Sequence, residues 1–366
     1  MEYKTIKELC DLVVDCPHST PTWTEHGKIV IRNNNIKNGR IDFTSPSFTD
    51  DEHFAQRIKR AVPKAGDIVI TREAPMGEVG MIPEGIKCCL GQRMVLLRAN
   101  ERICDKHYLL YGLQSQFVQH QISWSEGTGT TVSNLRIPHL EQIRVPYVPL
   151  DQQKKISSVL YALGDKIENN RKLNDNLQQQ AQAIYTSMFI NNADPAWRQG
   201  HLSDLITVKY GKDHKKLSDG CYPVYGSGGI MRYVERPLYD KESVLIPRKG
   251  TLNNVIYVNQ PFWSVDTMFY TEMRLPNVAK YVFHFIKSKD LASMNAGSAV
   301  PSMTTDILNA IEVAIPSAQD LEKFETLVSP LYRAVQENNI QSAKLAELRD
   351  TLLPKLMSGE LDVSNI

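Results

Sequence analysis

The chain has 366 residues, of which 42% are hydrophobic and 23% are charged, and its formal net charge is +1. This composition is typical of a folded globular protein long enough for two domains, and it excludes a disordered or fibrous chain. Because no run approaches about 18 apolar residues and the N-terminus has no apolar core of a signal peptide, we expect a cytoplasmic protein without membrane contact.

The first globular unit is predicted to cover residues 1–150. Short β-rich runs separated by turn signals predict strands at 28–32, 67–72 and 94–98. A helix is predicted at 106–123. These elements together indicate a mixed α+β domain.

A long helix is predicted to follow, from 151 to about 190. Pro146 and Pro149 close the first unit, and Asp151 stands where a helix N-cap belongs. The Asn- and Pro-containing segment 191–195 then ends the helix and forms a linker.

The second half of the chain repeats this order. From Trp197 to about 316 the sequence again predicts strands, at 243–247, 254–258 and 268–270. It also predicts one helix, at 279–288. A second long helix is predicted from 319 to 357. Pro354 lies near its end, so the last turn is expected to kink or to restart there.

Both long helices carry an apolar seam with alternating steps of four and three residues, the spacing of a coiled coil. The second seam follows the first by 168 residues, so that Asn170 and Asn338 occupy the same place. An apolar seam on one helix is not buried alone, and the two copies supply each other's partner. The predicted seam residues are Ile156, Leu160, Leu163, Ile167, Asn170, Leu177, Phe324, Val328, Leu331, Val335, Asn338 and Leu345.

The repeat extends beyond the helices, which disfavours the alternative that both simply belong to one larger helical domain. Three pairs upstream of the helices also lie 168 residues apart, namely Gly129 with Gly297, Val132 with Val300 and Leu135 with Met303. The segment 9–12 also resembles 202–205, at an offset of 193. Repeated segments whose intervening sequences differ are expected for two binding modules with separate specificities.

No catalytic or metal-binding signature is present. The chain has no P-loop, no H-E-x-x-H motif and no Asn/Asp-Pro-Pro-Tyr/Phe motif of an amino-methyltransferase. The glycine-containing run 127–131 is a weak candidate for a phosphate loop, because no convincing helix follows it. The six cysteines lack C-x-x-C spacing and are interpreted as reduced thiols, so no metal site is expected.

Several loops place basic side chains beside amides and hydroxyls. Arginine and lysine can pair with guanine edges or phosphates, and asparagine with adenine edges. For any single residue an ordinary solvated loop is the simpler interpretation, and a net charge near zero implies either a concentrated basic face or help from a partner. The candidate DNA-binding residues are Arg32, Asn33, Asn34, Asn35, Lys37, Arg72, Lys212, His214, Lys215, Lys216, Tyr225, Ser227, Arg248 and Lys249.

Several segments resemble the specificity (S) subunit of type I restriction-modification systems. The C-terminal run 348–361 is similar to the terminal motif of that family, and 145–156 is similar to the entry of its central conserved helix. The runs 244–251 and 263–267 resemble the recurring core of its target recognition domains. In the first unit, Glu73-Ala74-Pro75-Met76-Gly77 departs from the Gly-Thr that usually follows this core strand.

The resemblance implies an α+β fold with two mixed α/β target recognition domains separated by an intramolecular antiparallel coiled coil of two long helices. The implied parts are target recognition domains at 1–150 and 193–316, a central conserved helix at 151–192 and a C-terminal conserved helix at 317–366.

The resemblance also implies a non-catalytic subunit that reads a bipartite double-stranded DNA target and docks two modification (M) subunits and restriction (R) subunits. S-adenosylmethionine, ATP and magnesium are expected only on those partners. The alternatives are a fragment of a fused restriction-methyltransferase and a helical assembly scaffold that does not bind DNA.

Overall fold

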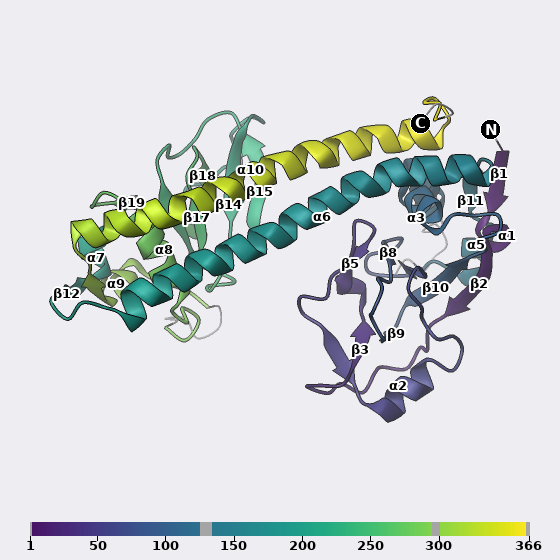
Figure 1. Ribbon diagram of the computed structural model, residues 1–366, viewed down its shortest axis with the longest axis horizontal. Coiled ribbons are helices and arrows are strands. Elements are labelled where there is room, and N and C mark those ends of the chain that lie inside the picture. Colours follow the sequence, from purple (N-terminus) through teal and green to yellow (C-terminus); the bar gives the residue numbers. More distant parts are fainter. Residues whose placement is uncertain (1, 125–133, 295–300, 364–366) are drawn as a thin grey trace. The chain divides into compact units, whose positions relative to one another are not determined.

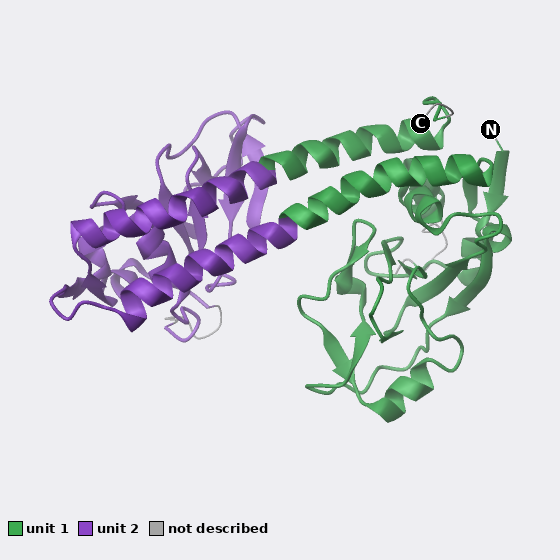
Figure 2. Cartoon of the chain, in the orientation of Figure 1, with its two compact units in different colours: residues 1–170, 340–366 green, residues 171–339 purple. Residues whose placement is uncertain are grey.

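The computed structural model describes residues 2–124, 134–294 and 301–363 (Figure 1). The chain forms two compact units, one of residues 1–170 with 340–366 and one of residues 171–339 (Figure 2). We call them unit 1 and unit 2. The division passes through both long helices, so each helix contributes one segment to each unit. The matches Gly129–Gly297 and Val132–Val300 and the glycine-containing run 127–131 lie outside the described residues.

Unit 1 is built around a four-stranded antiparallel sheet with the strand order β2-β10-β7-β8. These strands are Cys10–Asp15, Met94–Ala99, Ile68–Thr71 and Val79–Met81. A second sheet has the order β6-β3-β9, with Ser47–Thr49, Lys28–Ile31 and Cys88–Leu90. Two further pairs are β1 with β11, at Glu2–Thr5 and Arg144–Tyr147, and β4 with β5, at Ile36–Lys37 and Arg40–Ile41.

The short helices of unit 1 pack at the ends and over one face of these sheets. They are α1 Ile6–Leu9, α2 Asp51–Arg57, α3 Lys106–Gln114, α4 Gln116–Ser123 and α5 Ile137–Gln142. The prediction of one helix at 106–123 is wrong at Ser115, which has an extended backbone and separates α3 from α4. Its hydroxyl donates to the carbonyl of Gly112 at 2.6 Å and accepts from the N–H of Val118, so it ends one helix and caps the next.

Unit 2 repeats this topology. Its four-stranded antiparallel sheet has the order β13-β19-β16-β17, with Ile206–Tyr210, Met268–Met273, Ser243–Pro247 and Ile256–Val258. A three-stranded sheet has the order β15-β14-β18, with Gly229–Val234, Tyr222–Gly226 and Trp263–Ser264. The remaining elements are the pair β12 Arg198–His201 and β20 Glu312–Ile315, and the helices α7 Leu202–Leu205, α8 Ala279–Lys287 and α9 Thr305–Asn309.

One hydrogen bond recurs at matching places in the two units. Tyr108 on α3 donates its hydroxyl to the carbonyl of Pro146 at 3.0 Å, and Tyr281 on α8 donates to the carbonyl of Ala314 at 2.6 Å. The two acceptors are 168 residues apart, as the sequence repeat predicts. In both units, therefore, a tyrosine hydrogen bond joins the domain helix to the strand that precedes a long helix. We call Tyr108 and Tyr281 the fastening tyrosines.

The proposed match between 9–12 and 202–205 is wrong by three residues. The helix at Leu202–Leu205 corresponds to α1 at Ile6–Leu9, an offset of 196, whereas Cys10 already begins strand β2. Both helices are capped alike, because the N–H of Thr5 donates to Glu8 at 2.7 Å and that of His201 donates to Asp204 at 2.9 Å. The repeated Leu-x-Asp-Leu letters thus concealed the structural alignment.

The two long helices are α6, Leu150–Thr186, which continues as a π-helix at Ser187–Asn191, and α10, Ala318–Met357. α10 passes through Pro354 and ends at Met357, so the expected restart is absent. It also contains Pro330 in its interior, which the sequence analysis did not consider.

The helices pair in an antiparallel sense, which confirms that prediction. In unit 1, Ile156 and Leu160 belong to one buried cluster with Leu356, and in unit 2, Tyr185 clusters with Phe324. The α6 residue number rises as the partner number on α10 falls, and the segments of α6 and α10 run side by side (Figure 1). All twelve predicted seam residues are buried or half-buried.

A layer of amide side chains interrupts this apolar seam. In unit 1, Asn170 donates to Gln341 at 2.8 Å and to Ser342 at 3.2 Å. In unit 2, Asn338 donates to Asn174 at 2.9 Å. Because Asn338 follows Asn170 by the same 168 residues that separate Asn174 from Ser342, the two contacts are equivalent under the internal repeat.

Candidate nucleic-acid interface

In unit 1 the amide-rich candidate loop folds as a short 3-10 turn over Asn33–Asn35. Arg32, Asn34 and Lys37 are exposed beside it. The guanidinium of Arg32 lies 5.2 Å from the ring of Trp23 and donates to the hydroxyl of Ser47 at 3.4 Å. Weak contacts of this kind support an arginine that projects into solvent and leave it free to bind an anion.

The other two asparagines of the turn have different surroundings. Asn35 is buried, and its side-chain oxygen accepts from the N–H of Arg32 at 2.9 Å, so it shapes the loop. Asn33 donates to the carbonyl of Glu73 at 2.7 Å, and its side-chain oxygen is buried without a hydrogen-bond partner among the described residues. An unsatisfied acceptor of this kind is uncommon in a folded protein.

Arg72 is held inside unit 1. Its guanidinium pairs with Asp15 at 2.9 Å and donates to the carbonyl of Leu135 at 2.9 Å and to Asn134 at 3.1 Å. With 11% of its side chain exposed, it serves the fold in this structure and is less available to DNA than Arg32. The contact of Asn33 with Glu73 still places the amide turn beside the end of β7.

In unit 2 the lysine-rich candidate loop runs from Lys212 to Lys216. Lys212, Lys215 and Lys216 are exposed, and His214 is half-buried with a ring nitrogen that has no partner among the described residues. The N–H of Lys212 donates to the carbonyl of Ser264 at 2.8 Å, which fixes the start of the loop against β18.

Tyr225 and Ser227 lie at the end of the β14–β15 hairpin. Tyr225 is buried, which raises the pKa of its hydroxyl, and this hydroxyl accepts from Gln260 at 3.4 Å. Tyr225 is therefore a core residue and not an exposed reader. Sequence reasoning missed the neighbouring exposed apolar residues of β15, Ile230 and Met231, because an exposed position is not distinguishable from a core position in a short strand.

Arg248 in unit 2 corresponds to Arg72 in unit 1. The carbonyl of Arg248 accepts from the N–H of Met303 at 2.9 Å, as that of Arg72 accepts from Leu135 at 3.0 Å. The guanidinium of Arg248 donates to the carbonyl of Asp266 at 3.0 Å and lies 5.5 Å from the ring of Tyr210. Lys249 beside it is exposed.

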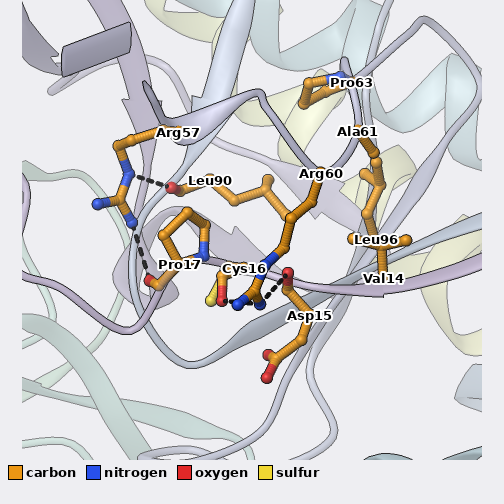
Figure 3. A pocket seen from close by; sticks show the side chains of 10 residues that line it. All are labelled: Val14, Asp15, Cys16, Pro17, Arg57, Arg60, Ala61, Pro63, Leu90 and Leu96. Carbon is orange, nitrogen blue, oxygen red and sulfur yellow. Dashed lines mark hydrogen bonds between the residues drawn. The ribbon is translucent and has the colours of Figure 1, made fainter. Parts of the chain in front are cut away.

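A small cavity lies between loops of unit 1. The cavity in Figure 3, lined by Cys16, Arg57 and Arg60 among others, has a volume of about 20 Å³, which is enough for one water molecule. Arg57 spans the neighbouring loops by donating to the carbonyls of Leu90 at 2.7 Å and Pro17 at 3.2 Å. This arginine is structural.

The described residues contain no group of three or more His, Cys, Asp or Glu side chains placed to hold a metal ion. Within the same ranges, no helix combines the length and the apolarity that a membrane span requires.

Comparison with known proteins agrees with this geometry. The family model for the type I restriction modification DNA specificity domain matches residues 1–179 and 196–345. The chain is 23% identical to the type I restriction enzyme MjaIX specificity subunit of Methanocaldococcus jannaschii, over 84% of this chain and 80% of that protein. It is 25% identical to the MjaVIII specificity subunit of the same organism, over 84% and 82%.

A solved structure has the same fold. The crystal structure of the type I restriction-modification system S subunit from M. genitalium superposes with a TM-score of 0.61 and covers 97% of this chain and 95% of its own, at 21% sequence identity.

Proposed function

Since the chain belongs to the family of type I restriction modification DNA specificity domains, we propose that it reads a bipartite DNA target, with one half-site for each unit. The observation that carries this proposal is the duplication itself. The two units share a strand order and a fastening tyrosine, yet the loops that follow their strands present different polar and basic side chains. Shared frames with different loops are suited to reading two different sequences.

The exposed cations of these loops supply phosphate contacts, and the amides and apolar groups between them supply base contacts. In unit 1 these residues are Arg32, Asn33, Asn34 and Lys37. In unit 2 they are Lys212, His214, Lys215, Lys216, Ser227, Arg248 and Lys249. Asn35, Arg72 and Tyr225 hold the loops in place, and their substitution is expected to act on loop structure.

The paired helices α6 and α10 are proposed to set the separation of the half-sites and to dock two M subunits, with R subunits joining the complex. Catalysis then belongs to these partners, which bind S-adenosylmethionine, ATP and magnesium. From Ile156 to Met188 an α-helix spans about 50 Å, or roughly one and a half turns of B-form DNA. Inserting four residues after Gln178 is expected to lengthen the unread spacer by about one or two base pairs.

The test is an exchange of residues 1–150 for the corresponding domain of another specificity subunit, with the methylated sites of the host genome as the readout. We expect one half of the target to change while the other half stays the same. A change in both halves would contradict independent reading, and a methylation profile that ignores the exchange would contradict the proposal itself.

Two controls separate the alternative functions. Purified chain incubated with labelled S-adenosylmethionine and DNA is expected to transfer no methyl group, whereas a fused methyltransferase would transfer it. The chain together with M subunits is expected to shift DNA in a gel, whereas a scaffold without a DNA role would leave the DNA unshifted.

A further inference from the structure

The β14–β15 hairpin of unit 2 combines an exposed apolar tip with two basic loops close to it. We infer that this tip enters the major groove of DNA and that the side chain of Met231 contacts the 5-methyl group of a thymine. The inference rests on the proposed function. It names one side chain and one base that determine part of the half-site read by unit 2.

The shape of the hairpin fits a groove. Its two strands are antiparallel, and Gly226 lies opposite Gly229 at the narrow end. A Cβ atom added at Gly228 or at Gly229 would meet no atom within 4 Å, so the end of the hairpin faces open space. A two-stranded ribbon is one of the elements that the major groove, about 12 Å wide, admits, and glycines allow its backbone to approach the bases.

The apolar side chains of β15 are unusually exposed. The exposed fractions are 61% for Met231, 48% for Ile230 and 50% for Tyr233. The Met231 sulfur lies over Gly226, where an added Cβ would approach it to 2.5 Å. The thioether therefore lies at the tip of the ribbon, where an exposed apolar side chain is available to a partner.

A basic loop lies on one side of this tip. The N–H of Lys212 donates to the carbonyl of Ser264 at 2.8 Å. The next residue, Val265, has a methyl group 3.8 Å from the Cβ position of Gly226. The start of the lysine-rich loop is thus connected to the apolar tip through Ser264 and Val265.

A second basic loop lies close to the hairpin turn. Gly250 directly follows Arg248 and Lys249, and a Cβ added there would be 3.1 Å from the hydroxyl oxygen of Ser227 in the hairpin turn. The side chain of Asn254 also donates to the carbonyl of Ser227 at 2.6 Å, which ties this loop to the turn.

The charge of the two loops identifies the occupant. They carry five cations, Lys212, Lys215, Lys216, Arg248 and Lys249, against one carboxylate, Asp213. Cations beside an apolar tip match the phosphates that border a groove whose floor carries thymine methyl groups. Among the bases, thymine is the one that offers an apolar group to the major groove.

The test uses the complex reconstituted with M subunits and a DNA duplex carrying its own target. Each thymine of the half-site read by unit 2 is replaced in turn by deoxyuridine, which removes the methyl group alone. For the wild-type complex, we expect one position at which uracil weakens binding by about fourfold, the effect of exposing one methyl group.

The variants assign that effect to a side chain. Met231→Ala is expected to bind thymine-containing DNA about fourfold more weakly than the wild type and to lose its sensitivity to uracil at that position. Met231→Leu, which keeps an apolar side chain, is expected to retain the sensitivity. Leu275→Ala removes another exposed apolar side chain of unit 2 and serves as the matched control without effect.

Three outcomes overturn the inference. One is equal uracil sensitivity in the wild type and in Met231→Ala, and another is a half-site in which no thymine is sensitive. The third is a Met231→Ala chain that loses its M subunits, which would make the hairpin a protein-docking surface. A wild-type complex that binds no DNA at any salt concentration would instead refute the proposed function.

Discussion

The domain helices α3 and α8 occupy the same place in the two units, but they meet the long helices through different chemistry. Three residues after its fastening tyrosine, α3 places Tyr111 in an apolar cluster with Ile156 and Leu160. At the equivalent position, three residues after Tyr281, α8 carries His284. The ring of His284 contacts Gln182 of α6 at 2.8 Å and Tyr332 of α10 at 2.9 Å. The junction is apolar in unit 1 and hydrogen-bonded in unit 2.

The same contrast recurs where the central sheets end. Arg72 and Arg248 are equivalent through their backbone contacts, and the edge strand of the same sheet ends at Asp15 in unit 1 and at Tyr210 in unit 2. Arg72 is held by an ion pair, whereas Arg248 lies against an aromatic ring. At these two places the backbone-directed bonds are shared by the two units and the side-chain pairs are not, which is how a duplicated frame can acquire two specificities.

The junction of unit 2 depends on a buried cation, and removing it is the largest change we predict. Lys280 is 5% exposed and pairs with Glu242 at 2.9 Å and Glu325 at 2.7 Å. Lys280→Met leaves two carboxylates without their cation and is expected to destabilise unit 2 by about 3 kcal/mol. Denaturant unfolding measures the loss.

The matched control lies at the equivalent position of unit 1. His107 occupies the place of Lys280, one residue before the fastening tyrosine, and its ring packs 4.7 Å from that of Tyr161. His107→Met is expected to change the stability by no more than about 1 kcal/mol. Equal losses in the two variants would show that the junctions do not differ in the way described.

His284 makes the stability of unit 2 dependent on pH. Burial lowers the pKa of its imidazole from 6.5 to about 4. Between pH 6.5 and pH 4 the His284 imidazole binds a proton in the unfolded chain but not in the folded chain. The free energy of unfolding therefore falls as the pH falls from 6.5 towards 4, by up to about 3 kcal/mol. Above that window the contribution is fully present.

The measurement is the melting temperature of the chain between pH 7.5 and pH 5. We expect His284→Gln to flatten the dependence, since glutamine does not titrate, while the unit 1 control Tyr111→Phe should leave it unchanged. An unaltered pH dependence in His284→Gln would assign the effect to other groups.

Periodic features of the fold were predictable from the sequence. The seam follows from a 4/3 spacing that a helix imposes over many turns, whereas the antiparallel sense was implied by the family resemblance. The strands 243–247 and 268–270 follow from buried β-branched and aromatic runs. Single-residue events were not predictable. Ser115 breaks a helix because its hydroxyl caps both sides, and α10 continues through Pro354 where a restart was expected.

The candidate site was predictable in its loops but not in its side chains. Arg32 and Lys212 are exposed as expected, whereas Arg72 and Tyr225 are engaged in the fold. An arginine after a strand looks the same in sequence whether a carboxylate such as Asp15 reaches it or not. That partner lies 57 residues away, so the ion pair depends on tertiary structure.

Substitutions in the lysine-rich loop of unit 2 and in the amide turn of unit 1 test whether both units contribute phosphate contacts. Alanine at Lys212, Lys215 and Lys216 is expected to weaken binding to all DNA sequences alike and to reduce the salt dependence by about three counterions. Alanine at Arg32 and Lys37 in unit 1 should reduce it by about two. Binding titrations at several salt concentrations supply both slopes, and slopes equal to that of the wild type would make these loops solvated surfaces.

The amide layer gives α6 and α10 equivalent polar side-chain contacts in both units. A buried polar seam residue commonly fixes register at a cost in stability. The double variant Asn170→Leu with Asn338→Leu, which preserves the internal symmetry, is therefore expected to raise the free energy of unfolding by about 1 kcal/mol and to loosen the alignment of the helices. Thermal unfolding measures the first effect.

Disulfide trapping measures the second effect. In an antiparallel helix pair the residue numbers of two contacting residues have a nearly constant sum, which is 511 for Asn170 with Gln341 and 512 for Asn174 with Asn338. The numbers of Leu177 and Val335 also sum to 512, so these two side chains are expected to face each other. Cysteines at 177 and 335 should form a disulfide readily with the natural asparagines in place and less completely in the double leucine variant. If the leucine variant is more stable and its trapping is undiminished, the asparagines do not set the register, and the apolar 4/3 seam is sufficient to align the two helices.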